Sequence, residues 1–263
     1  MLYKVRKSLR QTPVGETLVW IINHVYSYNS ASLFYWRLYD FLVMARFRRG
    51  LDTRVVVTRQ IPQEMAFDLL AKFKRSQRMP FRHDDHASGY IFHPDREHEN
   101  VARGKFEWVV LTGETLRCTF ALWEHIRPSA ESSLGAPLEV VNTKVQWMYP
   151  GVGKIGSNAW HVDGFPHQFY KILVYLSLTG ERLGGTEVRL PDGRTETVGG
   201  GMGEWVLFNP NTLPHRGTSL PNQERITVEL TVVRRLSQQK HLRFGGTNSA
   251  YPRFPWTRMP ALA

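Results

Sequence analysis

Between residues 142 and 234 the sequence is a series of short β-type segments separated by glycine- and proline-containing turns, and this series limits the possible folds most strongly. No helical pattern alternates with these segments, so an all-β barrel is predicted rather than a Rossmann-type sheet. Pro191-Asp192-Gly193 has the composition of a hairpin turn. The strands expected here are 142–149, 169–178, 186–190, 195–198, 204–209 and 225–233.

The first half of the chain is expected to add helical and irregular segments to this barrel. A helix is predicted over 62–75, because Pro62 suits a helix start and Met65, Leu69 and Phe73 follow at helical spacing. Further strands are expected over 53–58, 105–111 and 115–122, a long polar loop over 78–103, and a second loop over 128–137. The predicted divisions are a basic, aromatic-rich helical extension (1–54), the N-terminal part of the main domain (55–139), the β core (140–236) and an irregular tail (237–263).

Three residues of the β core have the composition of a metal site. His161 and Asp163 are two residues apart, so on an extended backbone their side chains leave the same face. His215, which follows the apolar run 205–208, is the expected third ligand. Two histidines and one carboxylate with open positions are typical of non-haem Fe(II) oxygenases, and the same set also suits a catalytic Zn(II).

Arg225 favours iron. It lies ten residues after His215 and opens a β-branched, alternating run in which Arg225 and Thr227 share a face. A guanidinium fork beside a hydroxyl suits a buried carboxylate. A zinc hydrolase needs no such anchor, whereas an oxygenase that uses a dicarboxylic co-substrate does.

With these residues the sequence resembles the Fe(II)/2-oxoglutarate-dependent dioxygenase superfamily. The matching pattern is His161-x-Asp163, then His215, then Arg225-x-Thr227, and the resemblance covers residues 140–234. Two further matches resemble prolyl-hydroxylase-type members: Tyr149-Pro150-Gly151 and Tyr175-Leu176-Ser177. Two others resemble phytanoyl-CoA dioxygenase relatives: Trp160-His161-Val162-Asp163-Gly164 and Gly184-Gly185-Thr186.

The resemblance implies a mainly β fold with flanking helices, a double-stranded β-helix (jelly-roll, cupin-like) barrel. It also implies Fe(II), O2 and 2-oxoglutarate as co-substrate, with release of succinate and CO2. The implied metal ligands and catalytic residues are His161, Asp163 and His215; the implied 2-oxoglutarate residues are Arg225, Thr227 and Tyr175 at the far carboxylate and Tyr149 or Gln146 at the near end. Tyr149 and Gln146 lie on opposite faces of one strand, so at most one of them faces the iron.

The charge pattern bears on the substrate. The chain carries a net charge of +11, and residues 1–54 hold nine basic against three acidic side chains, so much of the excess lies outside the β core. We expect these residues to form helices that pack on the barrel, with peripheral membrane contact as the alternative. The predicted substrate is a small molecule, anionic or lipid-linked, with Lys171 and Trp160 as candidate contacts and a cytoplasmic location.

Three other functions are weighed against this one. They are a peptidyl hydroxylase of the same superfamily, a non-catalytic basic module that binds membranes or polymers, and a cupin-like metal enzyme without 2-oxoglutarate. Nucleic acid is a disfavoured partner, because Thr231 and Val232 stand where repair-type demethylases carry a second arginine. Cys118 is the single cysteine, which excludes an internal disulfide, and we expect it in the core.

Overall fold

The computed structural model describes residues 56–80, 106–111, 113–150, 158–163, 169–176, 184–218 and 223–234. The elements are β1 (Val56–Gln60), α4 (Gln63–Arg75), β2 (Arg78–Pro80), β3 (Phe106–Val109), α6 (Gly113–Leu134), β4 (Leu138–Met148), β5 (Phe169–Tyr175), β6 (Thr186–Arg189), β7 (Thr195–Val198), β8 (Glu204–Phe208), β9 (His215–Gly217) and β10 (Arg225–Arg234). The predictions for residues 1–54, for the loop beyond Pro80 and for the tail 237–263 lie outside the described residues.

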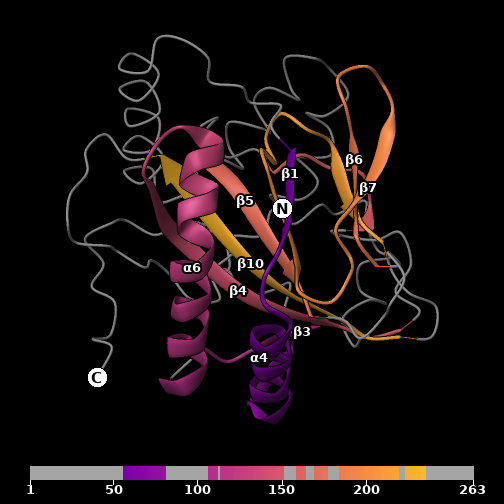
Figure 1. Cartoon of the computed structure of the whole chain (residues 1–263). Helices are drawn as coiled ribbons and strands as arrows, with labels where there is room; N and C mark the ends of the chain where they lie inside the picture. Colours follow the sequence, from indigo (N-terminus) through magenta and orange to yellow (C-terminus); the bar gives the residue numbers. More distant parts are fainter. Residues whose placement is uncertain are drawn as a thin grey trace, which may run out of the picture.

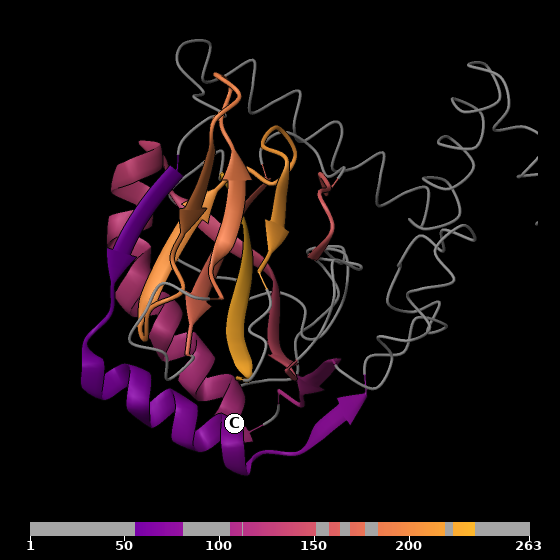
Figure 2. The ribbon, with the colours of Figure 1, turned by 90° about the vertical axis from the view of Figure 1, so that its right-hand side faces the viewer.

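The described strands form two sheets rather than a closed barrel. One has seven strands in the order β1-β8-β5-β10-β4-β3-β2, and the other has three in the order β7-β6-β9. Adjacent strands are antiparallel throughout. Figure 2 shows β6 and β7 in front of the larger sheet. A cluster of buried side chains from both sheets, including Tyr175, Phe208 and Val188, joins the two layers.

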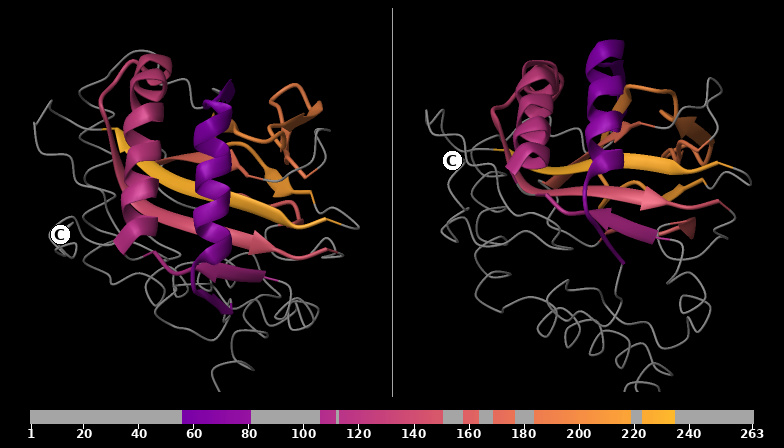
Figure 3. Two further views of the ribbon diagram at one scale, coloured as in Figure 1. Left: turned by 60° about the horizontal axis from the view of Figure 1, so that its bottom comes forward. Right: turned by 90° about the horizontal axis from the view of Figure 1, so that it is seen from below.

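The two described helices, α4 and α6, cover the opposite face of the larger sheet, as Figures 1 and 3 show. The main hydrophobic core lies between them and that sheet. Strand β5 contributes to both layers, because its side chains alternate: Ile172 and Val174 join the helix-side core, whereas Tyr175 joins the cluster between the sheets. Every residue of β5 is therefore buried.

Helix α4 confirms the prediction for 62–75. Pro62 stands at its N-cap, and Ala66, Leu69, Leu70 and Phe73 form one buried stripe. Their spacing of three and four residues places all of them on the face that meets the core.

Helix α6 contradicts two predictions. Residues 115–122, expected as a strand, and most of 128–137, expected as a loop, lie in this one helix. Leu116, Thr119, Trp123, Ile126 and Ala130 are its buried residues at intervals of three and four. That periodicity places the buried stripe over the sheet, and the helix continues through Pro128.

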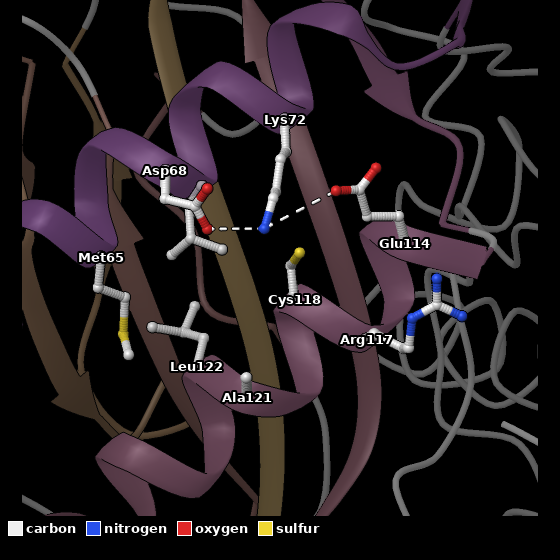
Figure 4. A pocket seen from close by; sticks show the side chains of 9 residues that line it. Met65, Asp68, Lys72, Glu114, Arg117, Cys118, Ala121 and Leu122 are labelled. Carbon is white, nitrogen blue, oxygen red and sulfur yellow. Dashed lines mark hydrogen bonds and ion pairs between the residues drawn. The ribbon is translucent and has the colours of Figure 1, made fainter.

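A groove of about 440 Å³ lies between α4 and α6, on the helix side of the larger sheet. Figure 4 shows Lys72 in it, with its ammonium 2.8 Å from Asp68 Oδ2 and 3.8 Å from Glu114 Oε1. Cys118 lines the same groove; it is partly buried and packs against the main core, so it lies at the edge of that core rather than inside it.

The strands of the β core largely follow the prediction. β7 has the expected bounds, β6 and β8 end one residue early, and β5 ends three residues early. The Asp192-Gly193 hairpin turn is present, with Gly193 at φ +85° and Arg194 N donating to Asp192 Oδ1 at 3.0 Å. The short strands β9 and β2 were not predicted, and β2 occupies the first three residues of the expected loop 78–103. Neither described helix combines the length and hydrophobicity that crossing a membrane requires.

Candidate metal centre

His161 and His215 are brought together by backbone pairing. His161 N donates to His215 O at 3.0 Å, and His215 N donates to His161 O at 2.9 Å. Residues that exchange both hydrogen bonds in an antiparallel pair lie directly opposite each other, with their side chains on one face. The two imidazole centroids are accordingly 4.3 Å apart.

Asp163 completes the group. Its backbone N donates to Pro210 O at 2.9 Å, which holds the segment after His161 close to the β8–β9 connection. Asp163 Oδ1 lies 3.5 Å from His161 Nε2 and 3.7 Å from His215 Nε2. One ligand atom from each of the three residues lies within 4.8 Å of the other two.

In the imidazoles of His161 and His215, the hydrogen bond made by Nδ1 leaves the lone pair of Nε2 available to a metal. Nδ1 of His161 is 2.7 Å from Ala159 O, and Nδ1 of His215 is 3.1 Å from Leu213 O. A carbonyl accepts only, so Nδ1 carries the proton in both rings. Such a bond through the second nitrogen is the usual way in which proteins orient a metal-binding histidine.

These residues fit a metal ion. His215 Nε2 is buried and has no hydrogen-bond partner, and an unsatisfied buried polar atom is costly unless a ligand takes it. Two imidazoles and one carboxylate on one side are the facial set of non-haem Fe(II) sites. Metal bonds of about 2.1 Å at right angles place ligand atoms roughly 3 Å apart, so the carboxylate and the imidazoles would have to approach one another to bind a metal.

The ionisation states also suit metal binding. Burial would raise the pKa of Asp163, but Lys171 and the two histidines outweigh it and hold that pKa well below its usual range. Burial lowers the pKa of His215 to about 3, against the opposing effect of Asp163. Near neutral pH the group therefore offers one carboxylate and a neutral imidazole at His215, the forms that bind metals.

A buried cation lies close to this group. Arg225, at the start of β10, is 6% exposed, and no described carboxylate forms an ion pair with it. Its Nη2 donates to Thr186 Oγ1 at 3.3 Å, its Nε has no acceptor, and its Cζ lies 5.5 Å from the Tyr175 ring centroid. Tyr175 also donates to Thr186 Oγ1, at 2.7 Å. Because a buried guanidinium is costly without a counter-charge, this arrangement suits an anion.

Gly217 and Gly199 leave space for the Arg225 guanidinium and the Tyr175 ring, respectively. A Cβ on Gly217 would lie 2.4 Å from Arg225 Nη1, and a Cβ on Gly199, at φ +66°, would lie 2.1 Å from Tyr175 Cε2. Both distances are far inside van der Waals contact, so a side chain at either position requires the arginine or the tyrosine to move.

Thr227 and Gln146 share the face of Arg225. Thr227 lies directly opposite Tyr175 on one side and Gln146 on the other, and opposed residues in a sheet project to the same face. The structure does not bring Tyr149 there. Its ring packs against the helix-side core, and its hydroxyl donates to Glu107 and accepts from Arg78. Of the two candidates for the near end, only Gln146 faces the metal group.

Of the two candidate substrate contacts, Trp160 points away from the His161–Asp163–His215 group and Lys171 faces it. Trp160 alternates with His161 and lies between two arginines: Arg189 Cζ and Arg216 Cζ are each 4.7 Å from its ring centroid. Arg216 alternates with His215 along β9, so Trp160 lies on the outer face of the smaller sheet. Lys171 does face the metal group, where its ammonium lies 2.6 Å from Asp163 Oδ2.

Two contributors were not predicted from the sequence. Thr186 was noted only as part of a glycine-rich step, yet its hydroxyl contacts both Arg225 and Tyr175. Gly217 had no assigned role. The signal for Gly217 is its spacing of two from His215, which places both on one face of β9.

No protein-family model and no curated protein sequence matches this chain. Among solved structures, the epimerase SnoN from nogalamycin biosynthesis, in complex with Fe3+, alpha ketoglutarate and nogalamycin RO, is 14% identical over 75% of this chain and 84% of its own, with a TM-score of 0.50. A prolyl-4-hydroxylase of Pseudomonas putida is 18% identical over 70% and 95%, with a TM-score of 0.46. A prolyl hydroxylase of Trichoplax adhaerens is 12% identical over 74% and 92%, with a TM-score of 0.49.

The fold assignment rests on the match to SnoN. Two antiparallel sheets packed face to face, with helices on the larger one, give this chain the fold of that protein. This confirms the predicted fold class, a mainly β jelly roll of the double-stranded β-helix type with flanking helices.

Proposed function

We propose that this chain is an Fe(II)- and 2-oxoglutarate-dependent dioxygenase that uses O2. The observation that carries the proposal is the buried Arg225 guanidinium beside Gly217, which is two residues along β9 from His215. Two residues of a strand span roughly 6.5 Å. On this spacing, the proposed anchor and the proposed metal ligands would be separated by about the length of a small dicarboxylic acid. The iron and alpha ketoglutarate of the SnoN complex support the same pairing.

Each residue has one role in this proposal. His161, Asp163 and His215 hold Fe(II), Arg225 and Thr227 hold the far carboxylate of 2-oxoglutarate, and Tyr175 is oriented through Thr186 to support them. Gln146 faces the near end. With these groups bound, the iron supplies the oxidation chemistry that yields succinate, CO2 and an oxidised substrate.

Apolar side chains keep water away from the ligands. Phe208 packs edge-on against the His215 ring, with centroids 4.9 Å apart, and Leu213 is buried in the same cluster. A dry, low-dielectric surrounding strengthens the hold of Arg225 on a carboxylate.

Succinate formation tests the function. With Fe(II), 2-oxoglutarate and O2, we expect the protein to form succinate, and Arg225→Ala to raise the KM for 2-oxoglutarate by roughly 100-fold, since losing one partner of a buried charged pair costs about 2–5 kcal/mol. Arg194→Ala, which removes an exposed arginine of the hairpin turn, is the matched control and leaves the KM unchanged. Absence of succinate, or an unchanged KM in Arg225→Ala, contradicts the proposal.

The proposed substrate is a small molecule, anionic or lipid-linked, which the enzyme hydroxylates. The excess of basic residues in 1–54 supports this, and so does the small molecule in the SnoN complex.

The proposed location is cytoplasmic, with peripheral contact to an anionic membrane. The full chain is then expected to sediment with vesicles that contain anionic lipid and to lose this on removal of residues 1–54, with neutral vesicles as the control. Equal sedimentation of the full chain and the truncated protein would contradict membrane contact through residues 1–54.

A further inference from the structure

Lys171 is a buried cation whose position is tied to the metal group. It lies on β5, on the face that also carries Tyr175, and is 7% exposed. Its ammonium is 2.6 Å from Asp163 Oδ2. Burying an ammonium is costly unless a carboxylate pairs with it, and here that carboxylate belongs to a metal-ligand residue.

The two oxygens of Asp163 therefore have different surroundings. Oδ1 faces the Nε2 atoms of His161 and His215, at 3.5 and 3.7 Å. Oδ2 is buried and faces Lys171. A carboxylate can bind a metal with one oxygen or with both, and in this arrangement one of the two is already engaged by a cation.

Lys171 is itself held in place across three strands. Its ammonium lies 3.7 Å from Glu229 Oε2 on β10, and Glu229 Oε1 lies 2.9 Å from Lys144 Nζ on β4. Glu229 is directly opposite Lys144 in the sheet. The four groups alternate in charge from Asp163 to Lys144, so Lys171 is fixed from the side opposite to the metal ligands.

We propose that Lys171 is a positioning residue that occupies Asp163 Oδ2 and restricts this aspartate to one ligand oxygen. The inference rests on the proposed function, because its consequence concerns 2-oxoglutarate: a second aspartate oxygen on the metal competes for a position that the co-substrate needs. Lys171 thus acts on co-substrate binding through Asp163, without contact to either the co-substrate or the substrate.

Co(II) in place of iron tests this without turnover. We would titrate wild type, Lys171→Met and Lys171→Arg with Co(II), record the visible ligand-field spectrum, and then titrate 2-oxoglutarate. Lys171→Met is expected to bind Co(II) at least as tightly as wild type, to show an altered spectrum, and to bind 2-oxoglutarate about tenfold more weakly or worse. Lys171→Arg, which keeps the cation, restores most of the 2-oxoglutarate affinity.

Lys72→Met is the matched control, since it removes another lysine that pairs with an aspartate, on the helix side of the sheet. It leaves the Co(II) spectrum and the 2-oxoglutarate affinity unchanged. If Lys171→Met is unfolded by circular dichroism, Lys171→Gln replaces it and is judged by the same comparison.

The outcomes separate the two claims. Suppose that wild type binds Co(II) and 2-oxoglutarate and that a folded Lys171 variant has the same spectrum and the same affinity. This result overturns the positioning role of Lys171 but not the proposed function. A variant that loses Co(II) and 2-oxoglutarate binding in parallel also overturns the positioning role, because the lysine would then only support the fold. Wild type that takes up no Co(II) or no 2-oxoglutarate overturns the proposed function and this inference together.

Discussion

At the scale of single residues, burial keeps the His215 imidazole neutral, which is the form that can bind a metal. His215 is 3% exposed, its Nδ1–H donates to the Leu213 carbonyl, and its Nε2 faces Asp163. Without a bound metal, the buried Nε2 has no hydrogen-bond partner, which lowers the stability of the folded protein. The cost should be visible in the metal-free protein as a dependence of stability on pH.

Acidification is expected to destabilise the metal-free protein. The pKa of His215 is near 6.5 when unfolded and about 3 when folded. Between these values the unfolded chain binds the proton and the folded one does not, so the free energy of unfolding falls as pH falls, by up to about 1.4 kcal/mol per pH unit. Urea unfolding from pH 7 to 4.5 with a chelator present measures this, and His215→Gln should flatten the slope. Equal slopes of unfolding free energy against pH in wild type and His215→Gln would contradict a lowered pKa for His215.

Gly217→Ala is expected to weaken 2-oxoglutarate binding and to spare the metal. The added Cβ would meet Arg225 Nη1 at 2.4 Å and Asn158 Oδ1 at 2.6 Å, so the guanidinium must leave its place. We expect a loss of affinity of roughly tenfold or more, or about 1.4 kcal/mol, by calorimetry on Co(II)-loaded protein. In Gly193→Ala, where a Cβ meets nothing within 4 Å, the affinity should not change. An unaltered affinity in Gly217→Ala would exclude Arg225 as the anchor.

At the scale of elements, the strands of the β core were predictable because their apolar runs end at glycine and proline turns. The helical stripe of α4 was equally clear. Residues 115–122 were misread because a short window with β-branched and aromatic residues fits a strand as well as one face of a helix. Only the continued spacing through Ile126 and Ala130 distinguishes the two.

The grouping of His161, Asp163 and His215 could be predicted from the sequence, but the contacts around it could not. Their spacing can be recognised in the sequence, since Asp163 follows His161 by two residues and Arg225 follows His215 by ten. Thr186 comes to Arg225 only because β6 pairs with β9, and Tyr149 is excluded only because its strand turns that side chain toward the helices. Both facts depend on pairing between distant segments, which local sequence does not encode.

The contribution of α4 to the fold can be measured on its two faces. Phe73 is fully buried in the helix-side core, whereas Phe67 is 47% exposed. We expect Phe73→Ala to lower the free energy of unfolding by about 3–5 kcal/mol, and Phe67→Ala to change it by at most about 0.5 kcal/mol. Denaturant midpoints measure both. A similar cost for the two would mean that the helix does not pack as described.

At the scale of the whole molecule, the larger sheet has one face packed against helices and one face that carries the candidate site. One face carries the described helices and the main core, and the smaller sheet lies on the other (Figures 1 and 3). The Arg225 and Lys171 side chains project to this second face, toward Thr186 and Asp163. The groove between α4 and α6 lies on the helix face, and its lining includes none of His161, Asp163 and His215. Substitutions on the helix face should therefore change stability more than ligand affinity.

The most direct test of the central claim is made without oxygen. Fe(II) and then 2-oxoglutarate are added to metal-free wild type and to Asp163→Ala, and the visible spectrum is recorded. The account predicts a weak charge-transfer band in the wild type that appears only when both are present and is weakened or lost in Asp163→Ala. A folded, iron-loaded wild type without this band would contradict it, and would favour a metal enzyme without 2-oxoglutarate or a binding module on the same fold.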